Sequence, residues 1–394
     1  MASVRQSPTD PVFVQNPYPF YARARSMAPL VQWDDYGMMA AFGHEAVHAL
    51  LRDRRFGREK PVELRRPVPA HLTAFDTVER HSLLNAEPPR HTRLRGLVLR
   101  AFTSRRITGL GPEIRTLCHQ LIDAFPTGSF DLLDAYCSRI PVLIIARLLG
   151  VPEEMWRDLL RWSHDMVAMY QARRTRVVEN AANQSADDFS AFLREYTNQR
   201  RASPRDDLIT QLIAAEEKSD KLSTDELIGT CILLLNAGHE ATVHGLGNGV
   251  KTLRETGTDL ACLTPDRIDA TVEEILRFDP PLHMFTRYAY DNIEIFGHRF
   301  NRGDEVALML AAANRDPEAW DNPDRFDPTS PIKTNASFGA GLHFCVGASL
   351  ARLEIAIGLA VLFERCSNLH LTTPPQYSDT YHFHGLTRLM VAVD

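Results

Sequence analysis

The longest stretch with a helical alternation of apolar and polar positions is LSTDELIGTCILLLNAGHEATVHGLGNGVKTLRE, at residues 222–255. Ser223 followed by Glu226 has the spacing of a capping box, in which each side chain accepts a hydrogen bond from the other residue's backbone N–H. The pattern therefore predicts one long helix over residues 223–255.

Two further segments predict helices closer to the C-terminus. TPDRIDATVEEILRFDPP ends at Pro280 and Pro281, which cannot continue a helix. GASLARLEIAIGLAVLFERC carries apolar residues along one helical stripe. The stripe consists of Leu350, Leu353, Ile357 and Val361.

Strand-like alternation is scarcer than helical periodicity. It occurs in PLVQWDDYGMMAAF (29–42) and in TRYAYDNIEIFGHRFNRGDEVALML (286–310), which also carry turn residues. Segments 65–85 and 371–385 are rich in Pro, His and Thr, so we expect loops there. The predicted fold class is mainly α with a smaller β region.

Composition narrows the class of protein. The 394 residues are 44% hydrophobic and 24% charged, as in ordinary globular proteins, and the net charge of −6 gives no basic balance for nucleic acid. No apolar run approaches the ~18 residues that span a bilayer. The six cysteines are scattered without a CxxC pair. We therefore expect a cytoplasmic protein with reduced thiols and with neither nucleic acid nor membrane as a partner.

The segment FGAGLHFCVG (338–347) places Cys345 in a glycine-rich loop directly before an apolar helix. The N-terminus of a helix is electropositive and favours a thiolate over a thiol. Glycines permit tight turns and the close approach of a flat ligand, a phenylalanine offers an apolar face, and a histidine can donate to an anion. These positions are Phe338, Gly339, Gly341, His343 and Gly347.

The longer segment FGAGLHFCVGASLAR (338–352) resembles the haem-binding loop of the cytochromes P-450. The resemblance implies that Cys345 is the thiolate ligand of haem b, a ligation that favours O–O cleavage. NPYPFYARAR (16–25) and ARLLGVPEE (146–154) are also similar to bacterial members. The resemblance thus covers nearly the whole chain and implies a single domain over residues 1–394, with the family's triangular prism of helices around a buried haem.

The same resemblance implies which side chains bind the haem propionates. His91 and Arg95 lie four residues apart, hence on one helical face, in a segment similar to the family's C helix. Arg287, in MFTRYAY, matches a third propionate-binding position, and His343 matches a fourth.

Glu274 and Arg277 match the family's ExxR pair, which forms a structural network behind the cysteine loop. The resemblance places the third member of that network in AANRDPEAWDNPDRFDP (312–328). Arg315 and Arg325 are the candidates.

AGHEAT (237–242) resembles the oxygen-binding kink of the family's long helix, so Ala237 and Gly238 are expected beside the haem. The acidic position is Glu240, but the usual alcohol position holds Ala241. Oxygen reduction consumes protons, and alanine cannot donate one. Thr242 follows one residue later, about 100° around the helix, so it is no simple substitute.

Three accounts of proton delivery stay open. In the first two accounts, which we prefer, a bound water or a substrate hydroxyl takes the place of the missing alcohol. In the third, Thr242 and His244 form another relay. Glu240, Ala241 and Thr242 are the expected catalytic positions in each case.

The resemblance implies a monooxygenase that hydroxylates or epoxidises a small lipophilic substrate with O2. No flavin or nicotinamide domain is seen, so electrons are expected from a ferredoxin and its reductase. Arg93 and Arg100, seven residues apart, give one helix a basic face on which an acidic ferredoxin could dock, although a merely solvated face is comparably plausible. Segments 60–85, 165–180, 234–237 and 283–285, with the loop near Phe383, are expected to line the substrate pocket.

Other functions are weighed against this one. A peroxide-driven or non-oxygenating haem-thiolate enzyme is the runner-up, and a haem-binding protein without turnover is more remote. His44, Glu45 and His48 form HExxH, the zinc-hydrolase pattern, with Glu59 or Glu63 as a conceivable third ligand. Fifteen histidines make a chance match unsurprising, and this reading is the least favoured.

Overall fold

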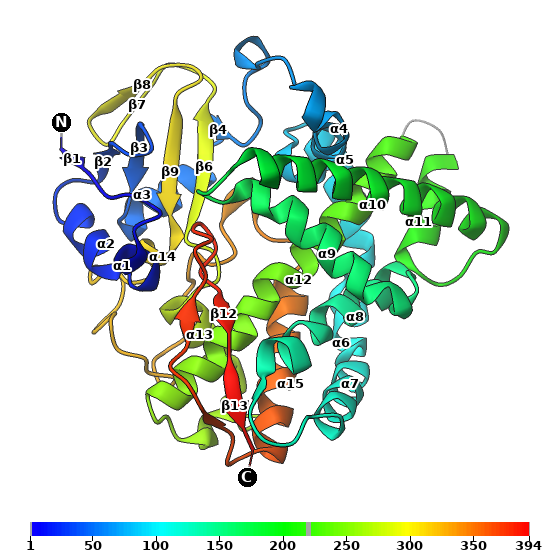
Figure 1. Cartoon of the computed structure of the whole chain (residues 1–394). Coiled ribbons are helices and arrows are strands. Elements are labelled where there is room, and N and C mark those ends of the chain that lie inside the picture. Colours follow the sequence, from blue (N-terminus) through cyan, green and yellow to red (C-terminus); the bar gives the residue numbers. More distant parts are fainter. Residues whose placement is uncertain (1, 218–221, 394) are drawn as a thin grey trace.

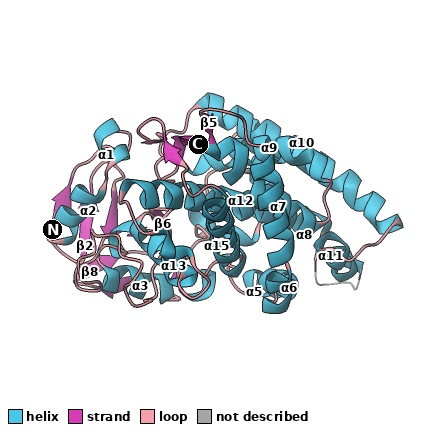
Figure 2. Ribbon diagram, turned by 90° about the horizontal axis from the view of Figure 1, so that it is seen from below, coloured by secondary structure: helices cyan, strands magenta, loops and turns pink. Residues whose placement is uncertain are grey.

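The computed structural model describes residues 2–217 and 222–393, except for the side chains of residues 101 and 217. The larger sheet lies at one side of the molecule and the long helices at the other, while short strands near the C-terminus lie beside the helices (Figure 1, Figure 2). The predicted mainly α fold with a smaller β region is confirmed.

The helices account for most of the described chain. The longer ones are α2 (Tyr18–Arg25), α3 (His44–Arg52), α4 (Thr73–His81), α5 (Arg90–Ala101), α7 (Gly111–Asp123), α8 (Arg139–Leu149), α9 (Trp156–Val167), α10 (Arg176–Ala202), α11 (Leu208–Glu217), α12 (Thr224–Glu255), α13 (Ile268–Phe278) and α15 (Ala348–Arg365). The short ones are α1 (Pro11–Gln15), α6 (Ser104–Gly109) and α14 (Leu310–Ala313). Single turns that matter below are η2 (Ala70–Leu72), η3 (Leu83–Asn85) and η6 (Ala168–Tyr170).

A six-stranded sheet has the order β1-β2-β3-β9-β6-β4. Its strands are β1 (Ser3–Val4), β2 (Leu30–Trp33), β3 (Met38–Ala41), β9 (Glu305–Met309), β6 (Met284–Ala289) and β4 (Phe56–Gly57). The smaller sheets use β5 (Phe130–Asp131), β7 (Ile293–Ile295), β8 (His298–Phe300), β10 (His370–Leu371), β11 (Gln376–Tyr377), β12 (Leu386–Arg388) and β13 (Met390–Ala392). Gly57 pairs with Tyr288 in antiparallel register, so the next residues, Arg58 and Arg287, lie beside each other at the sheet edge.

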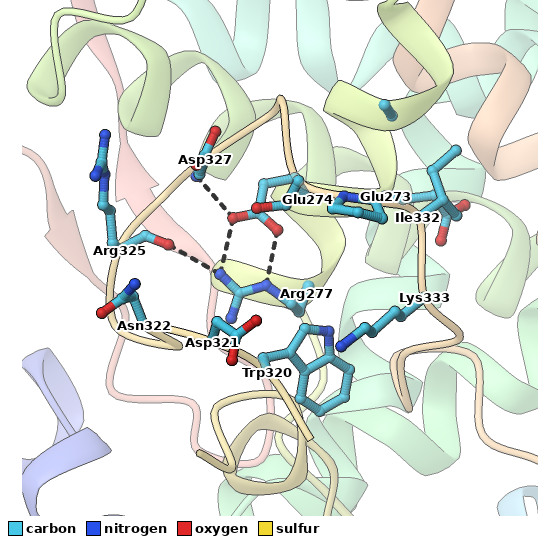
Figure 3. Close-up of a pocket in the computed structure, with 13 residues that line it drawn as sticks. Glu273, Glu274, Arg277, Trp320, Asp321, Asn322, Arg325, Asp327, Ile332 and Lys333 are labelled. Atoms are coloured by element: carbon cyan, nitrogen blue, oxygen red, sulfur yellow. Dashed lines mark hydrogen bonds and ion pairs between the residues drawn. The ribbon is translucent and has the colours of Figure 1, made fainter. Parts of the chain in front are cut away.

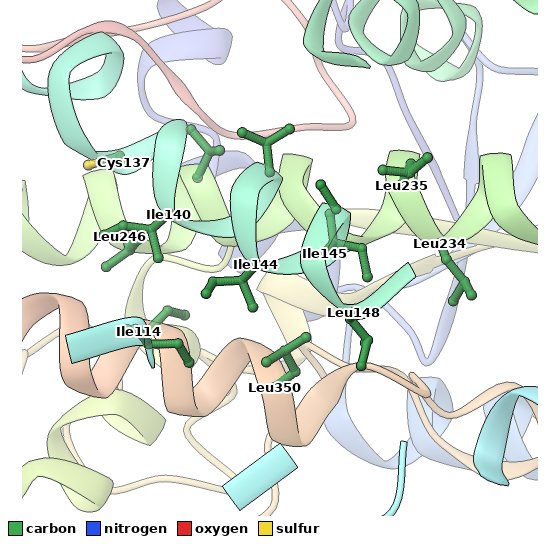
Figure 4. Close-up of a cluster of buried hydrophobic side chains, with 14 of the residues drawn as sticks. Ile114, Cys137, Ile140, Ile144, Ile145, Leu148, Leu234, Leu235, Leu246 and Leu350 are labelled. Carbon is green, nitrogen blue, oxygen red and sulfur yellow. The ribbon is translucent and has the colours of Figure 1, made fainter. Parts of the chain in front are cut away.

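The long helix α12 runs through the middle of the molecule and packs against α8, α15, α9 and α4 (Figure 1). Its predicted capping box is present in both directions. Figure 4 shows side chains of α8, such as Ile144 and Leu148, meeting Leu350 of α15, and Leu235 and Leu246 of α12 belong to the same buried cluster. Burial of this cluster fixes α12 against the helix that follows the cysteine loop.

The expectation of a loop over residues 65–85 is wrong in part, because α4 and two single turns form there. The first amides of α4 are capped from outside: Asn183 Oδ1, on α10, accepts hydrogen bonds from the backbone N–H of Ala74 (2.9 Å) and Phe75 (3.1 Å). A cap supplied from a residue so distant in the sequence leaves no local signature.

The ExxR pair sits at the centre of a buried network (Figure 3). Arg277 donates from Nε to Glu274 Oε2 (2.7 Å) and from Nη2 to Glu274 Oε1 (2.8 Å). The same guanidinium donates to the backbone carbonyls of Asn314 (3.0 Å), Pro323 (2.7 Å) and Arg325 (3.1 Å).

The third member of the network is therefore main chain, and of the two candidates Arg325 takes part, through its backbone carbonyl. Arg325 contributes its carbonyl, while Arg315 donates to the carbonyl of Phe278 (2.6 Å) and stacks on Tyr18. A guanidinium has five donors and no acceptor, so converging carbonyls suit it better than a second cation.

None of the helices in the described part of the chain combines the length and the apolar character that crossing a membrane requires.

Arg277→Met should destabilise the protein by about 3–5 kcal/mol, because it leaves the Glu274 carboxylate buried without its cation. Chemical denaturation followed by circular dichroism measures the loss. Arg161→Met is the matched control, since Arg161 forms an exposed pair with Asp158 and should cost at most about 1 kcal/mol. Equal losses in the two variants would contradict the structural role of Arg277.

Candidate functional site

A cavity of ≈530 Å³ lies among α12, α5, β6 and the cysteine loop. It brings together residues far apart in the sequence. The predicted site residues that line it are His91, Arg95, Ala237, Gly238, Glu240, Ala241, Thr242, Phe338, His343, Cys345 and Gly347. Gly339 and Arg287 lie just outside its lining, and Glu274 and Arg277 line a separate pocket (Figure 3).

The cysteine loop is shaped by backbone that only glycine adopts readily. Gly339 and Gly341 have φ angles of 68° and 70°. A Cβ at position 341 would lie 2.5 Å from the carbonyl oxygen of Leu51, so no side chain fits there. The N–H of Cys345 donates to the carbonyl of Phe338 (3.0 Å), which closes the loop beneath the cavity.

Burial raises the pKa of the Cys345 thiol, and this outweighs the opposing effect of the Gly347 N–H, of Arg95 and of Arg352. A metal ion deprotonates a coordinating thiol outright, so the loop is suited to a metal-bound thiolate.

Two histidines meet at one end of the cavity. The ring centroids of His91 and His343 are 4.5 Å apart, and His343 Nε2 donates to Glu87 Oε1 (2.9 Å). Burial lowers the pKa of His91 to about 4 and also lowers that of His343, so both rings are neutral near neutral pH. His91 Nδ1 is buried and has no hydrogen-bond partner among the described residues.

Two arginines lie near these neutral histidines and supply the positive charge at this end of the cavity. Arg287 is 2% exposed and donates to the carbonyl of Thr286 (2.8 Å), and Arg95 donates to that of Phe344 (2.7 Å). Neither forms an ion pair with any described residue. Burial and the neighbouring Arg58 lower the pKa of Arg287 to about 9, which still leaves it charged at neutral pH.

This donor set fits a haem. Unpaired buried cations are costly and imply an anionic partner, and the orphaned nitrogen of His91 implies a hydrogen-bonding one. Two arginines and two neutral imidazoles suit a flat ligand with two carboxylates, with the thiol of Cys345 available to its metal.

On the α12 side of the cavity, Glu240 stands among three histidines. Its Oε1 lies 3.0 Å from Nε2 of His164, on α9, and 3.9 Å from Nε2 of His239. Its Oε2 lies 3.6 Å from Nε2 of His244. The side chain of His164 is 55% exposed, whereas Glu240 is buried and lines the cavity. His164 therefore links the outer surface to the cavity.

Several lining residues were not predicted individually from the sequence. Arg58, Glu79 and Tyr170 all line the cavity, and so do apolar residues of the predicted pocket segments. The apolar members include Val78, Leu83, Leu234, Met284, Phe285 and Phe383. His164 has no motif around it, and its meeting with Glu240 depends on how α9 packs across α12.

The HExxH residues do not assemble a metal site in the described part of the chain. The rings of His44 and His48 stack at 4.1 Å, but Glu45 is exposed. Glu59 and Glu63 bond to arginines instead of approaching the histidines. The zinc reading is therefore wrong on geometry, because a third ligand is missing.

The basic face expected on α5 is smaller than predicted. Arg93 Nη1 donates to Glu226 Oε2 (2.9 Å), so its charge is neutralised by the acid of the α12 capping box. Arg100 and Arg105 are exposed.

Comparison with known proteins gives one consistent family. A family model described as "Cytochrome P450" matches residues 267–387. The biotin biosynthesis cytochrome P450 of Bacillus subtilis is 33% identical over 401 residues, which covers 100% of both chains.

Solved structures agree with the sequence matches. P450BioI in complex with an acyl carrier protein bearing hexadec-9Z-enoic acid superposes with a TM-score of 0.92 at 34% identity, covering 97% of this chain and 100% of that one. Myxobacterial CYP267B1 in complex with myristic acid gives a TM-score of 0.91 at 34% identity and covers 98% of each chain.

Cys345→Ser should abolish the thiolate-ligated haem spectrum and the activity, because a serine hydroxyl does not replace a thiolate on iron. Absorption spectroscopy of the reduced, carbon monoxide-treated protein measures this. Cys262→Ser is the control, since Cys262 is a buried free cysteine that does not line the cavity, and it should keep the spectrum. An unchanged spectrum in the Cys345 variant would contradict the assignment.

Proposed function

The chain belongs to the cytochrome P450 family and is a haem-dependent monooxygenase with haem b as its cofactor, and from this premise we propose that it hydroxylates or epoxidises a small lipophilic substrate. The observation that carries the proposal is the convergence of Cys345 and a group of unpaired cations on one mainly apolar cavity. We further propose that residues 1–394 form one domain that works in the cytoplasm. Six free cysteines and the bacterial relatives support that location.

In the proposed site, Cys345 ligates the iron, and a group of two arginines and two histidines binds the propionates. When bound, haem b supplies the redox-active iron at which O2 is reduced. The propionate-binding residues are His91, Arg95, Arg287 and His343. The residues that lie against the macrocycle are Ala237, Gly238, Phe338, Gly339 and Gly347.

A lipophilic substrate is supported by the cavity and by the relatives. Most of the side chains on its substrate end are apolar, so an apolar ligand gains free energy by leaving water. P450BioI binds a fatty acyl chain and CYP267B1 binds myristic acid, which are both lipophilic.

We propose that protons enter through His164 and Glu240. Nε2 of the partly exposed His164 is within hydrogen-bonding distance of the Glu240 carboxylate, which faces the cavity. Ala241 leaves room beside that carboxylate for a water or a substrate hydroxyl, which would complete the route without the usual alcohol. His244, whose Nδ1 is buried without a partner among the described residues, could serve a second route with Thr242.

His164→Phe should lower turnover by about tenfold or more, since positioned acid–base groups typically contribute 10²–10⁴-fold. The ratio of product to consumed reductant should fall at the same time. The solvent isotope effect on turnover should increase. His298→Phe, in the β7–β8 hairpin, is the control and should leave both unchanged. Unaltered coupling in the His164 variant would exclude this proton route.

We propose a ferredoxin and its reductase as electron donors, docking near the exposed Arg100 and Arg105. A ligand library is first screened for haem spin-state shifts, and binders are then tested for product with ferredoxin and reductase. Arg100→Glu should raise the apparent KM for ferredoxin without changing substrate affinity. Arg161→Glu, an exposed change on α9, is the control.

The outcomes of that reconstitution separate the candidate functions. Product formed with ferredoxin supports the monooxygenase, whereas binding without product would indicate a haem protein without turnover. Ala241 favours one second candidate, a peroxide-driven enzyme, because such an enzyme needs fewer delivered protons. Turnover with hydrogen peroxide that exceeds turnover with ferredoxin would identify it.

A further inference from the structure

Arg58 is a cation in the cavity without an anionic partner. Its guanidinium forms no hydrogen bond or ion pair with any described residue. It lies over the Phe285 ring, with Cζ 5.5 Å from the centroid. Its backbone N–H donates to Glu87 Oε1 (2.7 Å), which fixes the chain from which the side chain extends. The side chain therefore lines the cavity as an unused donor group.

The surroundings of Arg58 make this cation costly. Burial lowers the pKa of Arg58, and the adjacent Arg287 repels it from the neighbouring strand. A buried charge without a partner costs several kcal/mol unless an anion arrives. An apolar side chain at this position would be more stable, so the arginine indicates a ligand.

The strongest electrostatic partners of Arg58 belong to the elements that cover the substrate end. These are Tyr170, at the end of η6, and Glu79, on α4, whose effects on Arg58 exceed that of Glu87. The Glu79 carboxylate accepts a hydrogen bond from Asn85 Nδ2 (2.7 Å), and Tyr170 lines the cavity together with Glu79. Because burial raises the pKa of Glu79, this acid is a poor permanent counterion for Arg58.

We propose that Arg58 binds the carboxylate of an acidic lipophilic substrate, with Tyr170 as an additional O–H donor. The inference rests on the proposed monooxygenase function and narrows its substrate to molecules with a carboxylate and an apolar chain. A carboxylate offers the planar acceptor pair that matches a guanidinium. The apolar side chains that line the cavity, such as Val78 and Phe383, receive the apolar chain of the substrate.

A haem propionate is the other carboxylate that could reach this arginine. Arg95 and Arg287, with two imidazoles, already offer donors for both propionates. Arg58 lines the cavity together with Tyr170 and Glu79, which lie on elements that carry none of the four proposed propionate-binding residues, and this favours the substrate as the source. The experiment below separates the two.

The test measures binding to the holoenzyme, using dodecanoic acid, methyl dodecanoate and dodecan-1-ol as probes. Calorimetry and the haem spin-state shift give affinities without requiring turnover. The native protein should bind the acid more tightly than the ester. Arg58→Met should weaken acid binding by about tenfold to a hundredfold, the range expected for hydrogen bonds to a charged group, and leave ester affinity unchanged.

Two further variants sharpen the result. Arg58→Lys should retain part of the preference for the acid, because it keeps the charge but loses the planar fork. Glu79→Gln should leave the preference for the acid in place, because burial raises the pKa of Glu79 and its carboxyl contributes little negative charge beside Arg58. The melting temperature of Arg58→Met should equal or exceed that of the native protein, which separates a lost ligand contact from a folding defect.

The alternative source has its own readout. The rate of haem release to a haem-scavenging apoprotein should be the same in the native and Arg58→Met proteins. Faster haem release with an unchanged acid-to-ester ratio would assign Arg58 to a propionate and overturn the proposal. If Arg58→Met changed neither the ratio of acid affinity to ester affinity nor the rate of haem release, the proposal would be overturned as well. Tight acid binding without product in the reconstituted system would contradict the monooxygenase function while leaving this binding site supported.

Discussion

The buried guanidinium of Arg277 ties the helical part of the molecule to the segment that leads into the cysteine loop. It holds Glu274 of α13 and three main-chain carbonyls between residues 314 and 325 at the same time. Those carbonyls belong to irregular chain, which has no ladder of its own to satisfy them. The position of Cys345 depends on this segment, and so does the floor of the cavity.

The cavity above that floor is arranged around charges that the protein does not neutralise by itself. Arg95 and Arg287 are proposed to bind the propionates of the haem, and Arg58 is proposed to bind an acidic group that arrives with the substrate. Retaining such cations lowers the stability of the empty protein, and ligand binding returns that free energy. Catalytic competence and affinity for acidic ligands therefore have a common physical origin.

Local patterns in the sequence were sufficient for several elements and, together with the family resemblance they carry, for the centre of the site. Ser223 and Glu226 fixed the start of α12, because a capping box involves one helical turn. The glycines around Cys345 predicted a tightly turned loop, and residues 339 and 341 do adopt positive φ angles. The Glu274–Arg277 spacing predicted a pair, since residues three apart meet on one face.

Only the tertiary structure decided which distant side chains meet. The amides of α4 are capped by Asn183 from another helix, and the charge of Arg93 is taken up by Glu226. His164 reaches Glu240 because α9 crosses α12, and Arg58 faces the cavity because β4 pairs with β6. The sequence by itself determined the backbone preferences and the thiol-bearing loop, because those depend on neighbours a few residues away. The unpaired cations and the proposed proton entry depend on how separate segments pack together. No single segment encodes that packing.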